Sequence, residues 1–579
     1  MALLPYQDPG VPVEARVDDL IARMTPQEKA GLLFHPPIAQ GPDGTLSDAT
    51  ERLVGELGLS HFNVHKLADP RTTAQWHNRL QERAADTRLG IPVTLSSDPR
   101  HAFTDNPLAS VFAGDFSRWP EFIGMAAAGD AELVREQADI VRREYLAVGL
   151  RVALHPMADL ATEPRWARIS GTFGEDAHLA ARLVAAYVKG LQGETLGPDS
   201  VAAMTKHFPG GGPQLDGEDP HFSYGREQVY PGGMFEHHLI PFEAAFAAGG
   251  SQIMPYYGLP VGTEYEEVGF CFNADVIRDL LRGSYGFDGI VCADWNVLTA
   301  KSLGPVDIEA RGWGVEELDV PDRVVKALEA GVDQFGGESC APVVVDLLES
   351  GRLTADRVDR SVRRVLREKF RLGLFDERRY VDPDAAEAVV GHAEHRARGL
   401  DAQRRSTVLL TNRGETPALP LADGLRVYVE RIDPDVAAGY AGEIVADPAQ
   451  ADVAVLRVNA PFEPRDGFME SMFRQGSLEF PDAERDRLLA IAAAVPTVVV
   501  LQLDRPAVAT ELAGACAALL ADFGAEDGAV LDVVFGRHTP TAKLPFDMPS
   551  SMRAVRESRP DVPFDTAEPV FRFGHGLTY

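Results

Sequence analysis

The chain has 579 residues, of which 45% are hydrophobic, 25% charged and 8% aromatic, and this composition is typical of a folded protein with several domains. Asp and Glu number 87 against 56 Lys and Arg, which gives a formal net charge of -31. A negative field of this size disfavours nucleic acids and anionic membrane surfaces as partners. It sets no limit on an uncharged small-molecule substrate.

The cysteines and the first residues indicate a compartment. Four cysteines are spread along the chain without a Cys-x-x-Cys pair, which argues against a disulfide scaffold or a zinc site: Cys271, Cys292, Cys340 and Cys516. The start, "MALLPYQDPGVPVEARVDDLIARM", lacks the basic and apolar regions of a secretory signal, and no stretch approaches about 18 uninterrupted apolar residues. We therefore expect a cytoplasmic protein. The oligomeric state is left open, with a homodimer as one arrangement.

In residues 1–375, short apolar runs alternate with amphipathic segments such as "AELVREQADIVRREYLAVG". Such alternation predicts parallel strands joined by helices, most simply a (β/α)8 barrel, although only seven runs are counted. The runs are 61–66, 91–98, 151–159, 201–208, 252–258, 289–295 and 331–335.

A charged connecting stretch at 376–395 is followed by a second alternation, which predicts a smaller doubly wound sheet over roughly 395–545, in a second domain, an α/β sandwich of residues 396–579 that includes the C-terminal tail. Its expected strands are "STVLLTN", "LRVYVE", "DVAVLRVN", "TVVVLQL" and "CAALLADF". The tail "PVFRFGHGLTY" is aromatic and glycine-rich, so we expect it to be docked rather than frayed.

Polar residues fall at or just past the ends of the predicted barrel strands: Asp98, Lys206, His207, Tyr256 and Asp294. Barrel enzymes hold their active sites at this carboxyl-terminal face. In "GIVCADWNVL" a buried run stops at Asp294, and the simplest structural interpretation is a helix N-cap. The four other strand-end residues favour a shared site instead.

Several chemistries lack sequence support. There is no G-x-S-x-G, no H-E-x-x-H and no P-loop, and "PGGGPQLDG" is bracketed by prolines. The adjacent His237 and His238 are expected to be structural. Lys206 and His207 can donate hydrogen bonds to hydroxyls, Trp295 can offer a flat apolar face, and Arg168 adds charged donors. This set suits a neutral, hydroxyl-rich ligand.

Long motifs carry a resemblance to a known family. "VAAMTKHFPGGGPQLDG", "GFDGIVCADW", "ATEPRWARISGTFGED", "FGAEDGAVLDVVFGRHTPTAKLPFDMP" and "FRFGHGLTY" together resemble glycoside hydrolase family 3, of the β-glucosidase type without a fibronectin-like domain. The similarity runs from "RVDDLIARMTPQEKAGLL" to the last residue.

The resemblance implies a retaining mechanism at the junction of a (β/α)8 barrel and an α/β sandwich. Asp294 matches the nucleophile of the family, Lys206 and His207 its basic pair, and Arg168 its arginine. Asp98 matches the acid that binds the outer hydroxyls of the sugar. Tyr256 matches a tyrosine near the nucleophile, with Tyr257 as the alternative, and Trp295 is implied as a wall of the sugar pocket.

The acid/base is less determined. Two-domain members usually take a Glu from a second-domain loop, here "NAPFEPRDGFMESMFRQGSLEF", which offers Glu463, then Glu470, then Asp466. The single-domain N-acetylglucosaminidases of the family use an Asp-His dyad after the Lys-His motif. Asp219 and His221 in "LDGEDPHF" resemble that dyad, although the loop is longer here.

We therefore predict an exo-acting β-glycosidase that releases the non-reducing-end β-D-glucosyl unit by double displacement, with a small carbohydrate or glycoside as substrate and with no metal or organic cofactor. A β-xylosidase or β-N-acetylglucosaminidase is the first alternative. A glycoside phosphorylase or transglycosylase is the second, and a non-catalytic carbohydrate-binding protein is the third.

Overall fold

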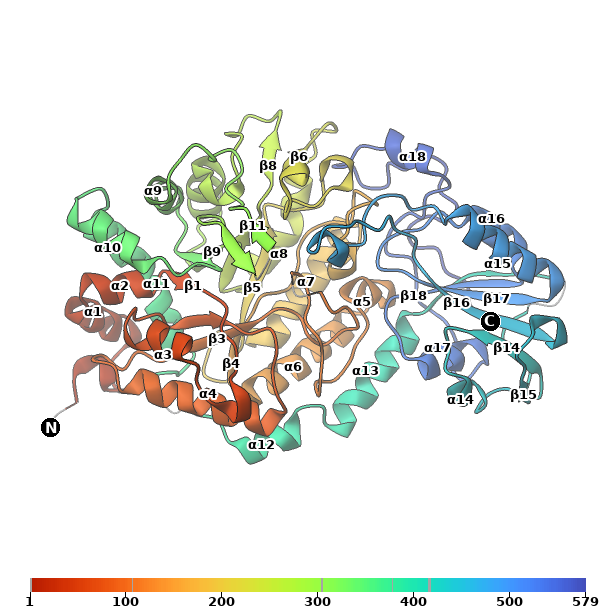
Figure 1. Ribbon diagram of the computed structural model, residues 1–579, viewed down its shortest axis with the longest axis horizontal. Helices are drawn as coiled ribbons and strands as arrows, with labels where there is room; N and C mark the ends of the chain where they lie inside the picture. Colours follow the sequence, from red (N-terminus) through yellow and green to blue (C-terminus); the bar gives the residue numbers. More distant parts are fainter. Residues whose placement is uncertain (1–2, 107, 304–305, 377, 415–417) are drawn as a thin grey trace.

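The computed structural model describes residues 3–106, 108–303, 306–376, 378–414 and 418–579 (Figure 1). Its larger sheet has eight strands in the order β1-β12-β9-β7-β5-β4-β3-β2, and every neighbouring pair is parallel. The strands are β1 (Phe34–His35), β2 (His61–Asn63), β3 (Thr94–Ser97), β4 (Leu150–Ala153), β5 (Ala202–Phe208), β7 (Gln252–Pro255), β9 (Ile290–Ala293) and β12 (Gln334–Gly336). All seven strands predicted for the barrel are present.

The strand missing from the sequence count is β1, and it almost closes the barrel. Only Phe34 and His35 form the ladder, because Pro36 and Pro37 follow and proline cannot donate a backbone hydrogen bond. Beyond them the chain reaches β2, where Asn63 N donates to Pro36 O at 3.0 Å and Ile38 N donates to Asn63 O at 2.9 Å. Two residues before a double proline give too short a pattern to predict a strand.

Helices surround the barrel (Figure 1). In α6, the side chain of Asp130 caps the first turn, and apolar residues at helical spacing, Leu133, Val134, Ile140 and Val141, are buried. The helices of this unit are α1 (Val13–Arg23), α2 (Pro26–Gly31), α3 (Asp48–Gly55), α4 (Pro70–Ala85), α5 (Phe122–Ala128), α6 (Ala131–Ala147), α7 (Ala177–Gln192), α8 (Ile240–Ala247), a π-helix (Asp275–Ser284), α9 (Val320–Ala330), α10 (Ala341–Glu349) and α11 (Ala355–Arg371).

The connecting stretch carries ordered helix. It contains α12 (Pro383–Val389), and α13 (Ala393–Ser406) then runs along the lower side of the view toward the second sheet (Figure 1). Buried Glu144 on α6 accepts hydrogen bonds from His395 Nδ1 at 2.8 Å and from His101 Nε2 at 3.0 Å. The connection is therefore tied to the barrel, while the domain limits given above stay a prediction.

The second sheet has six strands in the order β13-β18-β17-β16-β14-β15, with only the β13–β18 pair antiparallel. Helices α15 and α16 lie on one side of it and α14 and α17 on the other (Figure 1). The elements are β13 (Val408–Asn412), β14 (Arg426–Glu430), α14 (Pro434–Ala437), β15 (Glu443–Ile444), β16 (Val453–Asn459), α15 (Asp482–Ala494), β17 (Thr497–Gln502), α16 (Thr510–Ala515), β18 (Ala518–Asp522), α17 (Asp527–Val534) and α18 (Met552–Glu557).

The C-terminal tail is docked, as predicted. Leu577 N donates to Leu409 O on β13 at 2.7 Å, and His575 Nε2 lies 2.8 Å from Leu410 O. No helix in the described parts of the chain is long and apolar enough to cross a membrane.

Candidate active site

Asp294 follows the last residue of β9 and is 6% exposed. Its Oδ1 accepts a hydrogen bond from Trp295 N at 2.7 Å, whereas Oδ2 is buried without a hydrogen-bond partner among the described residues. The chain turns at Asn296, whose φ of 65° is tolerated better by Asn than by most residues, and no helix begins there. Asp294 is thus not a helix cap. A buried carboxylate oxygen without a partner is costly and is typical of a functional site.

Trp295 stands beside this carboxylate and is half-buried. Its ring lies over Gly336, where a Cβ would come within 2.5 Å of Trp295 Cε3, and His35 lies 5.6 Å away between ring centroids. Only glycine at 336 leaves room for the indole at this depth.

Lys206 and His207 are adjacent on β5, yet both reach polar partners in the site. The β5–β7 register shifts between Lys206 and Phe208, and such a bulge re-aims side chains that would otherwise alternate. Lys206 Nζ contacts Asp98 Oδ1 at 3.1 Å. His207 instead approaches the loop that carries Arg168.

Asp98 follows β3, and each of its two carboxylate oxygens accepts a hydrogen bond from a side chain. Oδ1 accepts from Lys206, and Oδ2 accepts from Asn63 Nδ2 at 3.1 Å. Burial alone would raise the pKa of Asp98, but the nearby Lys206 and His65 and the bond from Asn63 lower the pKa below its ordinary value. Asp98 is therefore ionised and can accept further hydrogen bonds from hydroxyls.

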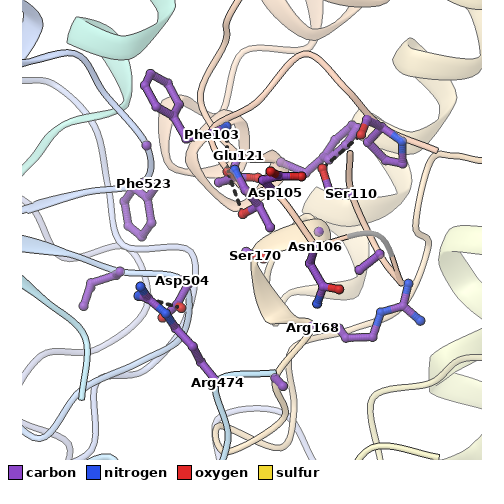
Figure 2. Close-up of a pocket in the computed structure, with 18 of the residues that line it drawn as sticks. Phe103, Asp105, Asn106, Ser110, Glu121, Arg168, Ser170, Arg474, Asp504 and Phe523 are labelled. Atoms are coloured by element: carbon purple, nitrogen blue, oxygen red, sulfur yellow. Dashed lines mark hydrogen bonds and ion pairs between the residues drawn. The ribbon is translucent and has the colours of Figure 1, made fainter. Parts of the chain in front are cut away.

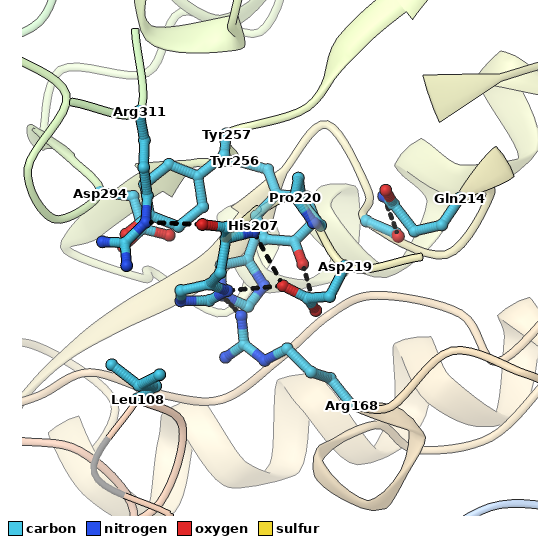
Figure 3. A network of polar contacts seen from close by, with 12 residues as sticks. Leu108, Arg168, His207, Gln214, Asp219, Pro220, Tyr256, Tyr257, Asp294 and Arg311 are labelled. Atoms are coloured by element: carbon cyan, nitrogen blue, oxygen red, sulfur yellow. Dashed lines mark hydrogen bonds and ion pairs between the residues drawn. The ribbon is translucent and has the colours of Figure 1, made fainter. Parts of the chain in front are cut away.

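Arg168 and His207 are in contact in the structure (Figure 3). Arg168 Nη1 lies 2.9 Å from His207 Nε2. Burial and the charges of Arg168 and Lys206 lower the pKa of His207 well below 6.5, so its ring is neutral. Since the guanidinium can only donate, His207 Nε2 accepts. The expectation that His207 donates to a sugar hydroxyl therefore does not hold for Nε2 in this arrangement.

The two tyrosines after β7 point to different partners (Figure 3). Tyr256 OH donates to Asp219 Oδ2 at 3.3 Å, and its ring lies 4.4 Å from that of His207. Tyr257 OH donates to Trp295 O at 2.9 Å, and burial together with the charge of Asp294 raises its pKa well above 10. Tyr257 is therefore the tyrosine beside Asp294.

The Asp219–His221 pair lies in the same cluster. His221 Nδ1 is 2.6 Å from Asp219 Oδ1, and the other oxygen, Asp219 Oδ2, accepts from Trp166 Nε1 at 3.0 Å. The His221 ring lies 4.9 Å from that of Tyr257. Burial would raise the pKa of Asp219, but His221 and Arg168 lower it below its ordinary value. The carboxylate is ionised and orients the His221 ring.

Arg311 links the loop of this pair to the loop of Asp294. Its Nε donates to His221 O at 3.1 Å and its Nη1 to Trp295 O at 3.2 Å. The guanidinium also lies 5.3 Å from the centre of the Tyr257 ring.

The second-domain loop that holds the expected acid/base docks on the barrel loop around residue 221. Phe473 lies 5.2 Å from His221 between ring centroids, and Arg465 forms an ion pair with Glu218. Glu463 is exposed, and a Cβ on Gly476 would come within 2.2 Å of its Oε2. Glu470 is half-buried and starts a 3-10 turn, Glu470–Met472, and Asp466 is exposed.

One buried guanidinium organises this loop. Arg505, after β17, donates to the carbonyl oxygens of Pro461, Gln475, Gly476 and Ser477, and also to Arg165 O of the barrel, at 2.8 to 3.1 Å. The loop and the strand-end face of the barrel are thus fixed to one side chain.

A cavity of about 270 Å³ adjoins the site at the junction of the two units (Figure 2). Arg168, Asn106 and Glu121 line it from the barrel, and Arg474 and Asp504 from the second domain. Asp504 Oδ2 accepts from Arg474 Nη1 at 3.2 Å. Asn106 Nδ2 donates to Met472 O at 2.9 Å, which connects the two walls directly.

The structure therefore brings the five strand-end residues, Asp98, Lys206, His207, Tyr256 and Asp294, to one face of the barrel, as the pattern predicted. Arg168 and Trp295 join them there. Sequence reasoning missed Asn63, Asp159 and Arg311. Asn63 and Asp159 also sit at or after strand ends, so that signal was available, whereas Arg311 lies in a loop with no recognisable pattern. Among the described residues, no group of three or more His, Cys, Asp or Glu side chains could hold a metal ion.

Comparisons with known proteins agree with this architecture. The N-terminal domain model of glycosyl hydrolase family 3 matches residues 42–368, and its C-terminal domain model matches residues 324–579. A relative named beta-glucosidase C from Emericella nidulans is 50% identical over 100% of this chain and 94% of its own length. A periplasmic beta-glucosidase/beta-xylosidase from Dickeya chrysanthemi is 42% identical over 100% of this chain and 92% of its own length.

Solved structures support the fold. A β-glucosidase from Erythrobacter marinus superposes with a TM-score of 0.78 at 23% identity, covering 99% of this chain and 84% of that one. A β-glucosidase from Listeria innocua in complex with isofagomine gives a TM-score of 0.76 at 23% identity, covering 97% and 83%. With both family models matched and full-length relatives at up to 50% identity, the chain belongs to glycosyl hydrolase family 3.

Proposed function

We propose that this chain is a retaining, exo-acting β-glucosidase that removes the non-reducing-end β-D-glucosyl unit. The observation that carries the proposal is the state of Asp294. One oxygen is anchored by Trp295 N, and the other is buried without a hydrogen-bond partner in the part of the chain that the structure describes. The carboxylate also interacts with the charge of Arg168. Relatives that cover the whole chain and are named β-glucosidases support the same activity.

This geometry supports a double displacement. Oδ2 of Asp294 attacks the anomeric carbon while the bond to the leaving oxygen breaks and an acid supplies a proton to that oxygen. The conjugate base then takes a proton from water, the water oxygen attacks the same carbon, and Asp294 leaves. Lys206 has used one of its three N–H donors on Asp98, so the remaining donors and the Asp98 carboxylate can bind sugar hydroxyls.

For the acid/base we propose Glu463, with Glu470 as the second choice on the same loop. Arg505 fixes that loop against the barrel, which gives the loop a defined position. A specific observation favours one competitor, His221, because Asp219 orients it beside Tyr257. Asp466, which is exposed, is the third choice on this loop.

Azide distinguishes these acids. With an activated aryl glucoside, loss of the true acid/base slows breakdown of the intermediate, and azide should restore turnover by forming a β-glucosyl azide. Rescue of Glu463→Ala alone would support the proposal. Rescue of Glu470→Ala or His221→Ala alone would move the role to that residue.

The substrate is tested on a panel of nitrophenyl glycosides. A β-glucosidase should prefer the glucoside to the xyloside and the N-acetylglucosaminide. Because the Dickeya relative is named for both glucosides and xylosides, a second, weaker xylosidase activity is the first alternative. Formation of a sugar 1-phosphate on addition of phosphate would instead favour a phosphorylase.

The cellular location and the assembly are also proposals. We propose a cytoplasmic enzyme, with a homodimer as one possible assembly. Fractionation of the native host and light scattering of the purified protein test these two points.

A further inference from the structure

We propose that Asp159, a residue of the loop after β4, is a positioning residue that fixes the tautomer of His207 and thereby holds Arg168 in the active site. The inference rests on the proposed function, because it concerns how that site is kept in order. Three side chains carry it, and each contact between them has a determined direction.

The first contact fixes the proton on His207. Asp159 is 1% exposed, and its Oδ2 lies 2.8 Å from His207 Nδ1. Its oxygens also accept the backbone N–H of His207 at 3.2 Å and that of Gly211 at 2.5 Å. An ionised carboxylate can only accept, so Nδ1 of His207 must carry the hydrogen of the contact with Oδ2. Burial raises the pKa of Asp159 to about 6, which leaves it ionised at neutral pH.

The second contact follows from the first. With the hydrogen on Nδ1 and a neutral ring, Nε2 of His207 has only a lone pair, and Arg168 Nη1 donates to it at 2.9 Å. In the other tautomer Nε2–H would face the N–H of the guanidinium. Two donors at this distance repel each other, so the tautomer of His207 determines whether Arg168 can keep its position against Nε2.

Arg168 depends on this bond to an unusual degree. Its guanidinium has five N–H donors. Among the described residues, it makes one hydrogen bond of good geometry, the bond to His207, and its buried Nε–H has no partner. Burial alone would lower the pKa of Arg168, but Tyr256 and the nearby carboxylates of Asp219, Asp294 and Asp159 raise it above its ordinary value. The cation therefore lies among the acidic groups of the site.

The local sequence supports the role of Asp159. A Cβ on Gly211 would come within 3.0 Å of Asp159 Oδ1 and 2.8 Å of Tyr256 Cε1. A glycine there lets the backbone N–H reach the carboxylate while the tyrosine ring packs alongside. The oxygens of Asp159 are thereby occupied by N–H donors of the protein.

The decisive experiment is a double-mutant cycle on 2,4-dinitrophenyl β-glucoside, whose good leaving group keeps weak variants measurable. Asp159→Asn puts an amide N–H among donors and should lower kcat/KM roughly 10- to 100-fold in the parent. In the Arg168→Ala background the same change should cost less than about threefold, because the side chain that it positions is gone. Asp159→Ala, which introduces no amide, should behave in the same way.

Glu175→Gln is the control for exchanging a buried carboxyl group for an amide. Burial raises the pKa of Glu175 to about 8, and among the described residues its oxygens accept the backbone N–H groups of Asp547 and Phe564. Its effect should be the same in the parent and in Arg168→Ala. Unfolding midpoints of all variants separate loss of fold from loss of position.

A second readout reports on the acceptor itself. Guanidinium ions should restore part of the activity of Arg168→Ala by occupying the vacated position against His207 Nε2. The rescue should need several-fold more guanidinium once Asp159 is also replaced. If the losses from Asp159→Asn and Arg168→Ala are multiplicative and the rescue concentration is unchanged, the positioning role is overturned. If Arg168→Ala alone turns glucoside over normally, the proposed function of this site fails instead.

Discussion

Asp98→Asn tests whether the sugar site is built around a carboxylate. Asp98 Oδ1 holds Lys206 Nζ and Oδ2 holds Asn63 Nδ2, both at 3.1 Å. An ionised carboxylate has about four acceptor positions, so about two remain for hydroxyls of the sugar. The amide keeps one acceptor and removes the charge.

The expected loss follows from these contacts. A hydrogen bond to a charged group contributes about 1.5–3 kcal/mol, and one to a neutral group about 1 kcal/mol. Losing one charged bond and weakening the other costs about 3 kcal/mol in the transition state, or roughly 100-fold in kcat/KM. Asn is preferred to Ala because Ala would leave the buried Lys206 without its partner.

The assay compares kcat/KM for the 4-nitrophenyl glucoside with its 4-deoxy and 6-deoxy analogues, in the parent and in Asp98→Asn. Removal of the hydroxyl that Asp98 binds should lower kcat/KM strongly in the parent and little in the variant. The loss from the deoxy substrate and the loss from Asp98→Asn should therefore not add. If kcat/KM for the glucoside falls less than about threefold, or if the folded variant loses as much kcat/KM on the deoxy analogues as the parent does, Asp98 does not bind a sugar hydroxyl through its charge.

Three further predictions follow from other contacts. Tyr257→Phe removes the hydroxyl that donates to Trp295 O beside Asp294, so in steady-state kinetics it should lower kcat roughly tenfold more than Tyr256→Phe does. A larger loss of kcat for Tyr256→Phe would contradict the assignment of Tyr257 as the tyrosine beside Asp294. Arg505→Met leaves five buried carbonyl contacts unmade and should lower both the unfolding midpoint and kcat, and a folded variant with parental kcat would show that the loop needs no such anchor. Burial raises the pKa of Glu368 on α11 to about 7 from 4.5, so its protonated form stabilises the native state at low pH and that stability is lost as the pH rises through 7. Relative to the parent, the free energy of unfolding of Glu368→Gln should therefore rise by up to about 3 kcal/mol between pH 4.5 and pH 8, as measured by denaturant unfolding. If the two proteins differ by the same amount at both pH values, Glu368 does not have a raised pKa in the native state.

Much of the fold could be predicted because its strands are buried on both faces. All seven residues of β5 are buried, so it reads as a continuous apolar run with polar residues toward its end, and β9 stops at an isolated acid in the same way. Strand β1 could not be predicted, since only two residues precede a double proline and its ladder depends on β12.

The candidate site was predictable where function and strand ends coincide. The choice between Tyr256 and Tyr257 was not, because the direction of each side chain after β7 depends on packing that the sequence does not encode locally. Asp159 and Arg311 act on their neighbours from irregular loops, and their partners become visible only when β4, β5 and β9 lie side by side.

The central claim is that Asp294 forms a covalent bond with the sugar. Incubation with a 2-deoxy-2-fluoro-β-glucoside carrying a good leaving group, followed by proteolysis and mass spectrometry, tests it directly. We expect one labelled peptide containing "GIVCADWNVL" with the fluoroglucosyl group on Asp294, and no label in Asp294→Ala. A label on Asp98, Asp219 or any other residue, or turnover of the glucoside by Asp294→Ala at the parental rate, would contradict it.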